Sequence, residues 1–422
     1  MTVPVASRPA VLPEAVLAAY RRHLSGGRAT LAELTGSAME VRSAGSLVHD
    51  ADGTAYLDCG GYGVFLLGHR HPRVVAAVVD QVNRHPMATR LLLEPVAAQA
   101  AAALAAVAPP GLHRVHFTNS GAEATEAAIK LARLHGRTQL ISAVGGFHGK
   151  TMGALSLTAR SLYQDPFRPL LPDVRHVPFG DAGALEVAVR AAAGRGCVVL
   201  EPVQGEGGVR IPPPGYLRAA AALCRRYGAL LVLDEVQSGL GRLGHWWGAD
   251  REQVRPDLLL VGKTLSGGVI PVAAVLSTDA VYEPFDRDPF LHSSTFAASP
   301  VAMAAAHATV ATIRDEGLVD RAAELGRRLR DGLRAAAERH ADRLPCQVRG
   351  AGLLVGVELP DEGRAGRLVL ELMDRQVLVN HSLNAQRVIR FTPPAVLTDG
   401  ELDWALTAFA DAVAACARRR AG

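Results

Sequence analysis

Lys130, Lys150 and Lys263 are the only lysines in a chain that carries 45 basic residues. Arginine can replace lysine at most exposed positions, but a guanidinium keeps its proton and cannot act as an amine nucleophile. A buried ammonium can be shifted toward the neutral amine, which attacks a carbonyl and forms a Schiff base. In a chain that otherwise uses arginine, we therefore expect at least one of the three lysines to do chemistry.

Glu201, Asp234 and Lys263 follow or end three short apolar runs with the composition of buried strands. In open α/β sheets, ligands bind beyond the carboxyl ends of the strands. One such residue alone is most simply explained as a solvated residue at the start of a loop. Three at corresponding positions favour a catalytic site in which carboxylates and a lysine converge.

The segment 117–126 is a second candidate, because it leads into a helical pattern. Ser120 and Glu123 have the spacing of a capping box, and Gly121 permits a close backbone approach. The free N–H groups and the positive dipole end of such a helix suit a phosphate. We predict an anion site here rather than a plain helix cap, and a solvated or lightly packed Lys130 further along the helix.

The tripeptide Gly-Lys-Thr occurs twice, at 149–151 and 262–264, and Leu230–Glu235 looks like a strand of a P-loop ATPase. A phosphate-binding loop needs an earlier glycine, separated by four residues from the Gly-Lys pair. Those two positions hold Val144 and Asp257. We therefore reject the ATPase interpretation.

The formal net charge is +4 and the arginines are scattered, so we expect no nucleic-acid binding. No apolar run reaches about 18 residues, so we expect no membrane span. The five cysteines are odd in number and lack CxxC spacing, which favours reduced thiols and argues against a metal site such as zinc. Because Met1–Ala10 lacks the pattern of a secretory leader, we predict a cytoplasmic protein.

The elements that must position these residues follow an α/β pattern. From about Val115 to Val275, short apolar runs alternate with helical segments, as in a parallel sheet with crossover helices. The first 45 or so residues read as helical, and Ser46–Asp58 reads as a hairpin around Asp52-Gly53. We predict helices over Pro72–Pro86, Pro95–Val107, the Ala-rich stretch after Pro300 and Asp399–Arg418, and strands over Val198–Leu200, Ala229–Leu233, Leu258–Val261, Gly352–Leu359 and Gln376–Val379.

A chain of 422 residues is long enough for two domains. We expect residues 1–54 to be an N-terminal segment that contributes to a small domain. Residues 55–300 would form the large domain with the candidate site. Residues 301–422 would form the rest of the small domain.

As a set, these segments resemble the class III (ω-amino group) aminotransferases of pyridoxal-phosphate fold type I, over about 57–398. The resemblance implies a large domain with a mostly parallel seven-stranded sheet flanked by helices, a smaller α/β domain, and pyridoxal 5'-phosphate as cofactor. The most specific segments are Ser120-Gly-Ala-Glu-Ala124, Phe147-His-Gly-Lys-Thr151, Glu201-Pro-Val-Gln-Gly-Glu-Gly-Gly208, Leu233-Asp-Glu-Val-Gln-Ser-Gly239 and Gly262-Lys-Thr264.

The resemblance also implies a role for each matching residue. Lys263 would form the Schiff base with the cofactor and then move the proton between the substrate carbon and the cofactor. Asp234 would keep the pyridine nitrogen protonated, so that the ring accepts electrons. The remaining implied cofactor-binding residues are Ser120, Gly121 and Ala122 at the phosphate, Phe147 on the ring face and Gln237 at the phenolic oxygen, together with His148 and Glu201.

On the substrate side, Arg390 matches the family arginine that binds the α-carboxylate of glutamate or 2-oxoglutarate, a task suited to a guanidinium fork. Glu206 matches the acidic residue that neutralises this arginine when an amine without that carboxylate enters, although the pair could also be a structural salt bridge. Tyr62 is expected at the entrance. Thr295 resembles the threonine that reaches the phosphate of the neighbouring subunit, which implies a homodimer with shared active sites.

Lys150 occupies a position where acetylornithine and ornithine aminotransferases usually have arginine. Ala297–Pro300 also departs from the common pattern, Gly-Gly-Asn-Pro. Whether Lys150 binds a carboxylate or is a polar wall residue stays open. The segments that look more like putrescine (diamine) aminotransferases are Phe147–Lys150, Pro166–Leu171, His176–Gly180, Pro213–Tyr216 and Pro289–His292.

We therefore predict an enzyme that moves a terminal amino group from a diamine or ω-amino acid to 2-oxoglutarate, giving an aldehyde and glutamate in a ping-pong reaction. The alternatives are decarboxylation-coupled transamination, an amino mutase reaction, or transamination of a specialised carbonyl in secondary metabolism. A regulatory or scaffold protein that binds the cofactor without turnover is disfavoured by the intact Lys263, Asp234 and Gln237.

Overall fold

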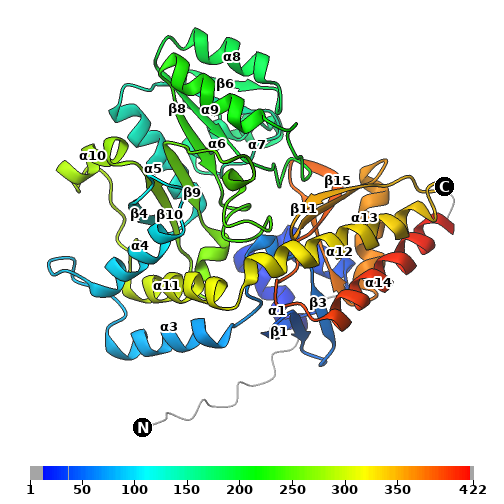
Figure 1. The fold of residues 1–422 in the computed structure, drawn as a ribbon. Coiled ribbons are helices and arrows are strands. Elements are labelled where there is room, and N and C mark those ends of the chain that lie inside the picture. The colour runs from blue at the N-terminus through cyan, green and yellow to red at the C-terminus, as the bar shows by residue number, and fades with distance from the viewer. Residues whose placement is uncertain (1–12, 37, 419–422) are drawn as a thin grey trace.

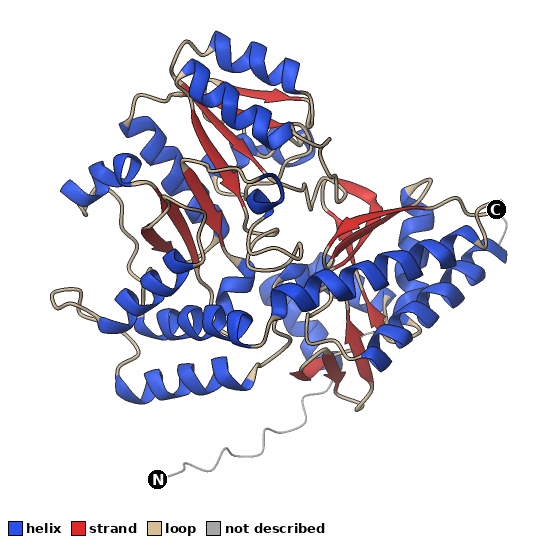
Figure 2. Ribbon diagram, viewed as in Figure 1, coloured by secondary structure: helices blue, strands red, loops and turns tan. Residues whose placement is uncertain are grey.

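A seven-stranded sheet dominates the computed structural model, which describes residues 13–36 and 38–418 (Figures 1 and 2). Its order is β4-β10-β9-β8-β7-β5-β6, and β10 is antiparallel to both neighbours while the other neighbours are parallel. The mostly parallel seven-stranded sheet is thus confirmed. The strands are β4 Arg114–Thr118, β5 Gln139–Ala143, β6 Val174–Val177, β7 Gly196–Leu200, β8 Leu230–Asp234, β9 Leu258–Val261 and β10 Ala273–Ser277.

Helices cover both faces of this sheet. Alternate residues of its strands point to opposite sides, so each face contributes side chains to a separate core. In β8, Leu231 and Leu233 pack in the core shared with α8 and α9, whereas Val232 packs in the core beneath α5. Buried runs of this kind fit strands covered on both faces. The helices of this part are α3 Pro72–Arg84, α4 Pro95–Ala106, α5 Gly121–Leu134, α6 Met152–Leu157, α7 Ser161–Gln164, α8 Ala182–Ala191, α9 Tyr216–Tyr227, α10 Asp279–Arg287 and α11 Pro300–Asp315.

A smaller lobe with two four-stranded sheets lies beside the large sheet, at the right of Figure 1. One sheet, β1-β2-β3-β13, combines an early and a late segment of the chain, since Leu57 pairs in parallel with Val377. The other has the order β11-β12-β15-β14. The lobe contains β1 Glu40–Ala44, β2 Leu47–Asp50, β3 Ala55–Asp58, β11 Gln347–Ala351, β12 Leu354–Glu358, β13 Val377–Leu378, β14 Asn380–Ser382, β15 Ala385–Phe391, α12 Leu318–Glu338, α13 Glu362–Met373 and α14 Asp399–Arg418.

The N-terminal prediction is only partly right. Helices α1 (Pro13–Ala19) and α2 (Gly26–Leu34), with a π-helical turn between them, agree with a helical lead-in. Strand β1 contradicts it, because pairing with β2 overrides the local preference of Glu40–Ala44. Residues 1–12, which include the segment assessed for a leader, lie outside the described residues.

The remaining predicted elements are found, with additions. The hairpin turns at Gly53, whose φ of 87° suits glycine. The Ala-rich stretch after Pro300 is two helices, α11 and α12, separated at Gly317, which has φ 62°. Strands β11, β14 and β15 were not predicted; β11 and β15 pair with β12, whereas β13 pairs with β3. None of the helices in the described chain has the length and apolar character needed to cross a bilayer.

Candidate active site

The carboxyl edge of the large sheet brings the predicted residues together. Asp234 ends β8, Glu201 follows β7, and Lys263 follows β9 after Gly262. Because these strands are parallel neighbours, their carboxyl ends open on the same edge. Two buried carboxyl groups and one amine therefore face a common site.

Lys263 is the first residue of a short 3-10 helix, Lys263–Ser266, and has a left-handed φ of 41°. Such a conformation costs a non-glycine residue about 1–3 kcal/mol and often marks a functional position. The lysine lines a cavity of about 330 Å³ together with Ser120 and Gly121. Burial lowers the pKa of Lys263, although the carboxylates of Glu206 and Asp234 oppose the shift. The site thus favours a neutral amine more than water does.

Asp234 is held by a buried histidine. His148 Nδ1 lies 2.8 Å from Asp234 Oδ2, and Oδ1 of the same carboxylate accepts a hydrogen bond from Val236 N at 3.1 Å. Burial alone would lower the pKa of His148, but the hydrogen bond to Asp234 and its charge raise it overall. The hydrogen bond between the two side chains fixes the orientation of the carboxylate.

Glu201 lies beside this pair and contacts the loop that contains Phe147. Its Oε2 accepts a hydrogen bond at 3.0 Å from the backbone N–H of Phe147, which is half-buried. Burial raises the pKa of Glu201 to about 7, against the opposing charge of His148. Near neutral pH, this carboxyl is therefore divided between its charged and neutral forms.

The start of α5 is the helix N-terminus on which the predicted anion site rests, but the expected capping box is absent. Ser120 is the N-cap, and its Oγ accepts a hydrogen bond from Glu123 N at 3.2 Å. Glu123 does not complete a capping box, because its Oε2 accepts from Asn119 N at 2.7 Å instead of from Ser120 N. The N–H groups of Gly121 and Ala122, in the first turn, have no acceptor within the helix and stay available for an anion.

Val236 was not among the site residues expected from the sequence, although it lies between Asp234 and Gln237. A Cβ added at Gly121 would be 2.9 Å from Val236 Cγ1, and one added at Gly262 would be 3.4 Å from it. The valine therefore fixes the closest approach of the helix start and the lysine-bearing strand. Only glycine fits at Gly121 without movement of Val236.

Arg390 and Glu206 form a buried ion pair, with Nη1 2.5 Å from Oε1 and side-chain exposures of 1% and 5%. Arg390 Nη1 also donates to Gln237 Oε1 at 3.2 Å. Gln237 Nε2 and Arg390 Nε are buried and have no partner among the described residues. Since an unpaired buried donor is costly, both atoms are available to an acceptor from a ligand.

Tyr62 and Lys150, the remaining residues expected on the substrate side, are both exposed. Tyr62 has φ 50° in the turn Gly61–Gly63, and its side chain is exposed. The turn contacts the site through Gly63, where an added Cβ would be 3.6 Å from Gln237 Nε2. Lys150 is exposed, and its Nζ lies 4.1 Å from the centroid of the Tyr163 ring, a cation–π contact.

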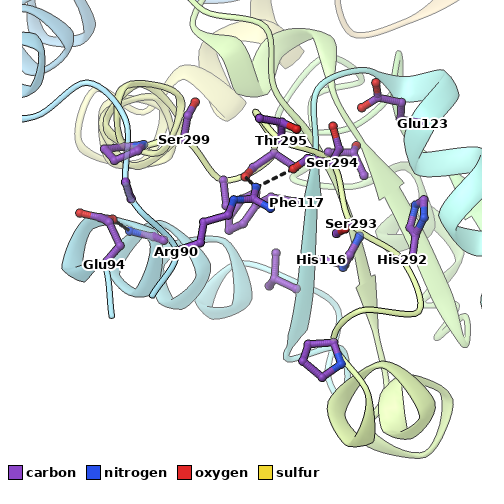
Figure 3. A pocket seen from close by; sticks show the side chains of 18 of the residues that line it. Arg90, Glu94, His116, Phe117, Glu123, His292, Ser293, Ser294, Thr295 and Ser299 are labelled. Carbon is purple, nitrogen blue, oxygen red and sulfur yellow. Dashed lines mark hydrogen bonds between the residues drawn. The ribbon is translucent and has the colours of Figure 1, made fainter. Parts of the chain in front are cut away.

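Thr295 is not brought to Lys263 within one chain. It is exposed and lines a separate cavity of about 570 Å³ between the edge strand β4 and the loops before α4 and α11 (Figure 3). Arg90 crosses this cavity and donates to Ser294 O at 2.6 Å. Lys130 also lies near this side; it is exposed, as predicted, and its Nζ lies 3.1 Å from His292 Nδ1.

Arg242 was not predicted at all. It is fully buried and donates to the carbonyl oxygens of Pro393 at 2.6 Å, Leu353 at 3.3 Å and Gly63 at 3.3 Å. Burial lowers the pKa of Arg242 to about 9. One side chain thus connects the turn that carries Tyr62 with two segments of the smaller lobe.

The fold and this site define a pyridoxal-phosphate enzyme of fold type I. The family described as aminotransferase class-III matches residues 33–413, and the chain belongs to that family.

Solved structures agree with the family. An ornithine aminotransferase from Toxoplasma gondii, in which pyridoxal phosphate partially occupies the active site, is 33% identical, with a TM-score of 0.88 over 96% of this chain and 94% of that one. An (S)-enantioselective ω-transaminase from Thermomicrobium roseum is 30% identical, with a TM-score of 0.87 over 96% and 98%. A transaminase from a marine Virgibacillus is 25% identical, with a TM-score of 0.85 over 90% and 93%. The protein is therefore a class III aminotransferase that depends on pyridoxal phosphate.

The residues fit this cofactor. Gln237 Nε2, which has no partner among the described residues, could donate to its phenolic oxygen, the helix start at Gly121 and Ala122 could accept its phosphate, and Lys263 could supply the amine. When bound, pyridoxal phosphate supplies a carbonyl that reacts with amines and a ring that accepts electrons.

Proposed function

We propose that the enzyme transfers the terminal amino group of a diamine or ω-amino acid to 2-oxoglutarate, giving an aldehyde and glutamate in a ping-pong cycle. The buried Arg390–Glu206 pair next to Gln237 carries this proposal. A free Arg390 suits a substrate with an α-carboxylate, whereas an Arg390 neutralised by Glu206 suits an amine without one. One pocket can then serve both half-reactions.

Lys263 is the proposed proton carrier. Its lowered pKa makes the neutral amine accessible, and Nζ would carry the proton from the substrate carbon that bears nitrogen to the cofactor carbon, and in the reverse direction in the opposite half-reaction. Asp234, oriented by His148 and by Val236 N, would accept a hydrogen bond from the protonated ring nitrogen. Glu201 would hold the loop that bears Phe147 and His148 through its bond to Phe147 N.

The proposed cradle for the phosphate is Ser120, Gly121 and Ala122, with Phe147 against the ring. The free first-turn N–H groups and the positive helix end support it. Tyr62 is proposed at the entrance. For Lys150, the cation–π contact with Tyr163 supports the wall role, because the ammonium already has a partner.

We also propose a homodimer with shared active sites. Thr295 lines the neighbouring cavity and not the cavity around Lys263, and it is exposed where a second subunit could receive it. Leu91, Leu92 and Leu93 are 79–101% exposed on the loop beside the same cavity. Exposed apolar groups of this kind mark protein interfaces. Light scattering of the holoenzyme should give twice the chain mass, and Leu92→Glu should shift it toward the monomer.

The amine donor is best found with a panel of putrescine, cadaverine, ornithine, acetylornithine, lysine and 4-aminobutyrate, each with 2-oxoglutarate and scored by glutamate release. Turnover with one or more of them supports the proposal. Product formed without release of glutamate, or release of carbon dioxide, would favour the mutase or decarboxylating reactions instead. Absence of visible absorption from cofactor joined to Lys263 would contradict the role of that lysine. A cytoplasmic location stays a prediction from the sequence.

A further inference from the structure

The carboxylate of Glu206 is held by a second contact, on the side opposite Arg390. The Oε2 atom of Glu206 accepts a hydrogen bond from the backbone N–H of Leu383 at 2.8 Å. The backbone carbonyl oxygen of Glu206 accepts a second hydrogen bond from Asn384 N at 2.9 Å. Leu383 and Asn384 form the turn between β14 and β15, and Arg390 lies on β15. One hairpin of the smaller lobe therefore supplies both donors to the two oxygens of Glu206.

Two side chains connect this turn with the loop after β5 and with α7. Asn384 Nδ2 donates to Gly145 O at 3.1 Å and to Gly146 O at 3.0 Å, directly before Phe147. The Tyr163 hydroxyl donates to Leu383 O at 3.2 Å. The same Tyr163 ring carries the cation–π contact with Lys150. The position of the Leu383 amide is thus set by groups outside the hairpin.

We propose that the Leu383–Asn384 turn is a latch that holds Glu206 on Arg390 and so sets the balance between amine and carboxylate substrates. This inference rests on the proposed function. To free Arg390 for 2-oxoglutarate, Glu206 must break the contact with Arg390 and leave the Leu383 N–H without its acceptor. Each lost hydrogen bond weakens acid binding by about two- to tenfold. A turn that holds Glu206 firmly favours binding of an amine without an α-carboxylate. A turn that holds it loosely favours binding of 2-oxoglutarate.

Asn384 and Tyr163 are positioning residues in this scheme, and they can be changed without touching Glu206 or Arg390. Asn384→Ala removes two anchoring bonds, and Tyr163→Phe removes one while it keeps the ring under Lys150. Gln386→Ala is the matched control, because Gln386 is an exposed residue of the same hairpin with no side-chain hydrogen bond among the described residues.

The test measures the affinity of the holoenzyme for glutarate, an unreactive dicarboxylate probe, and the KM values for 2-oxoglutarate and for the best donor of the panel. We expect Asn384→Ala and Tyr163→Phe to lower the glutarate Kd and the 2-oxoglutarate KM by about two- to tenfold, while the donor KM stays or rises. Gln386→Ala should leave all three unchanged.

Three results would overturn the inference. If both variants keep the cofactor absorption and the wild-type glutarate Kd, the turn does not hold Glu206. If the acid and amine KM values rise together, the turn has only a general structural role. If the wild-type enzyme neither binds glutarate nor uses 2-oxoglutarate, the proposed function fails and the latch fails with it.

Discussion

Removal of the Arg390 side chain tests the carboxylate-binding half of the reaction. The Arg390 side chain is 1% exposed, contacts Glu206 and Gln237 through Nη1, and has an Nε with no partner in the described part of the chain. A carboxylate that displaces Glu206 could therefore bind two guanidinium N–H groups. We expect Arg390→Ala to remove that fork while it leaves the amine half-reaction largely intact, because the amine meets an Arg390 already neutralised by Glu206.

The size of the effect follows from the two bonds. A hydrogen bond to a charged group contributes about 1.5–3 kcal/mol, so two contribute at least about 3 kcal/mol, or roughly a hundredfold in affinity. Arg390→Ala should thus raise the KM for 2-oxoglutarate about a hundredfold and the donor KM less than about tenfold. Arg390→Lys keeps the charge but loses the fork, so it should fall between wild type and Arg390→Ala.

Steady-state kinetics with each substrate varied at a saturating level of the other would measure these values. Stability needs its own control, because Arg390→Ala leaves Glu206 buried without its cation, at a cost of about 3–5 kcal/mol. The double variant Arg390→Ala/Glu206→Gln should recover most of this loss in urea denaturation but not the KM for 2-oxoglutarate. Equal rises of both KM values in Arg390→Ala would refute the reasoning.

Three further predictions concern other buried groups. Lys263→Ala should bind the cofactor without joining it covalently and lose several orders of magnitude in kcat; near-normal turnover would remove Lys263 from the mechanism. Because burial raises the pKa of Glu201 to about 7, the unfolded chain ionises it first, so native stability falls between about pH 4.5 and 7. Glu201→Gln should flatten that fall by up to about 3 kcal/mol in urea titrations at several pH values, and an unchanged slope would contradict it. Arg242→Met, which removes the donor to three carbonyl oxygens, should lower the free energy of unfolding by about 2–3 kcal/mol. A variant whose free energy of unfolding equals or exceeds that of the wild type would mean that burying the charge costs as much as its hydrogen bonds contribute.

The strand ends could be predicted because buried strands and their terminal residues leave a local signature. Asp234 and Lys263 fall where the apolar runs indicated, and helix α14 has the expected bounds. The Leu383 contact could not be predicted, since a backbone N–H has no side-chain signature. Arg242 gave no signal either, because its acceptors come from segments more than 100 residues away in the chain. Thr295 was recognised by motif, yet its partner would belong to another subunit.

The parallel pairing of β3 with β13 has a consequence for biosynthesis. Leu57 and Val377 are partners although some 320 residues separate them. At a translation rate of about 5–20 residues per second, β3 emerges from the ribosome roughly 15–65 s before its partner strand exists. During that interval the β1-β2-β3 strands have an open edge, which is a template for pairing with other chains. The smaller lobe can close only after nearly the whole polypeptide has been made, so nascent chains that stall before residue 378 should be prone to aggregation.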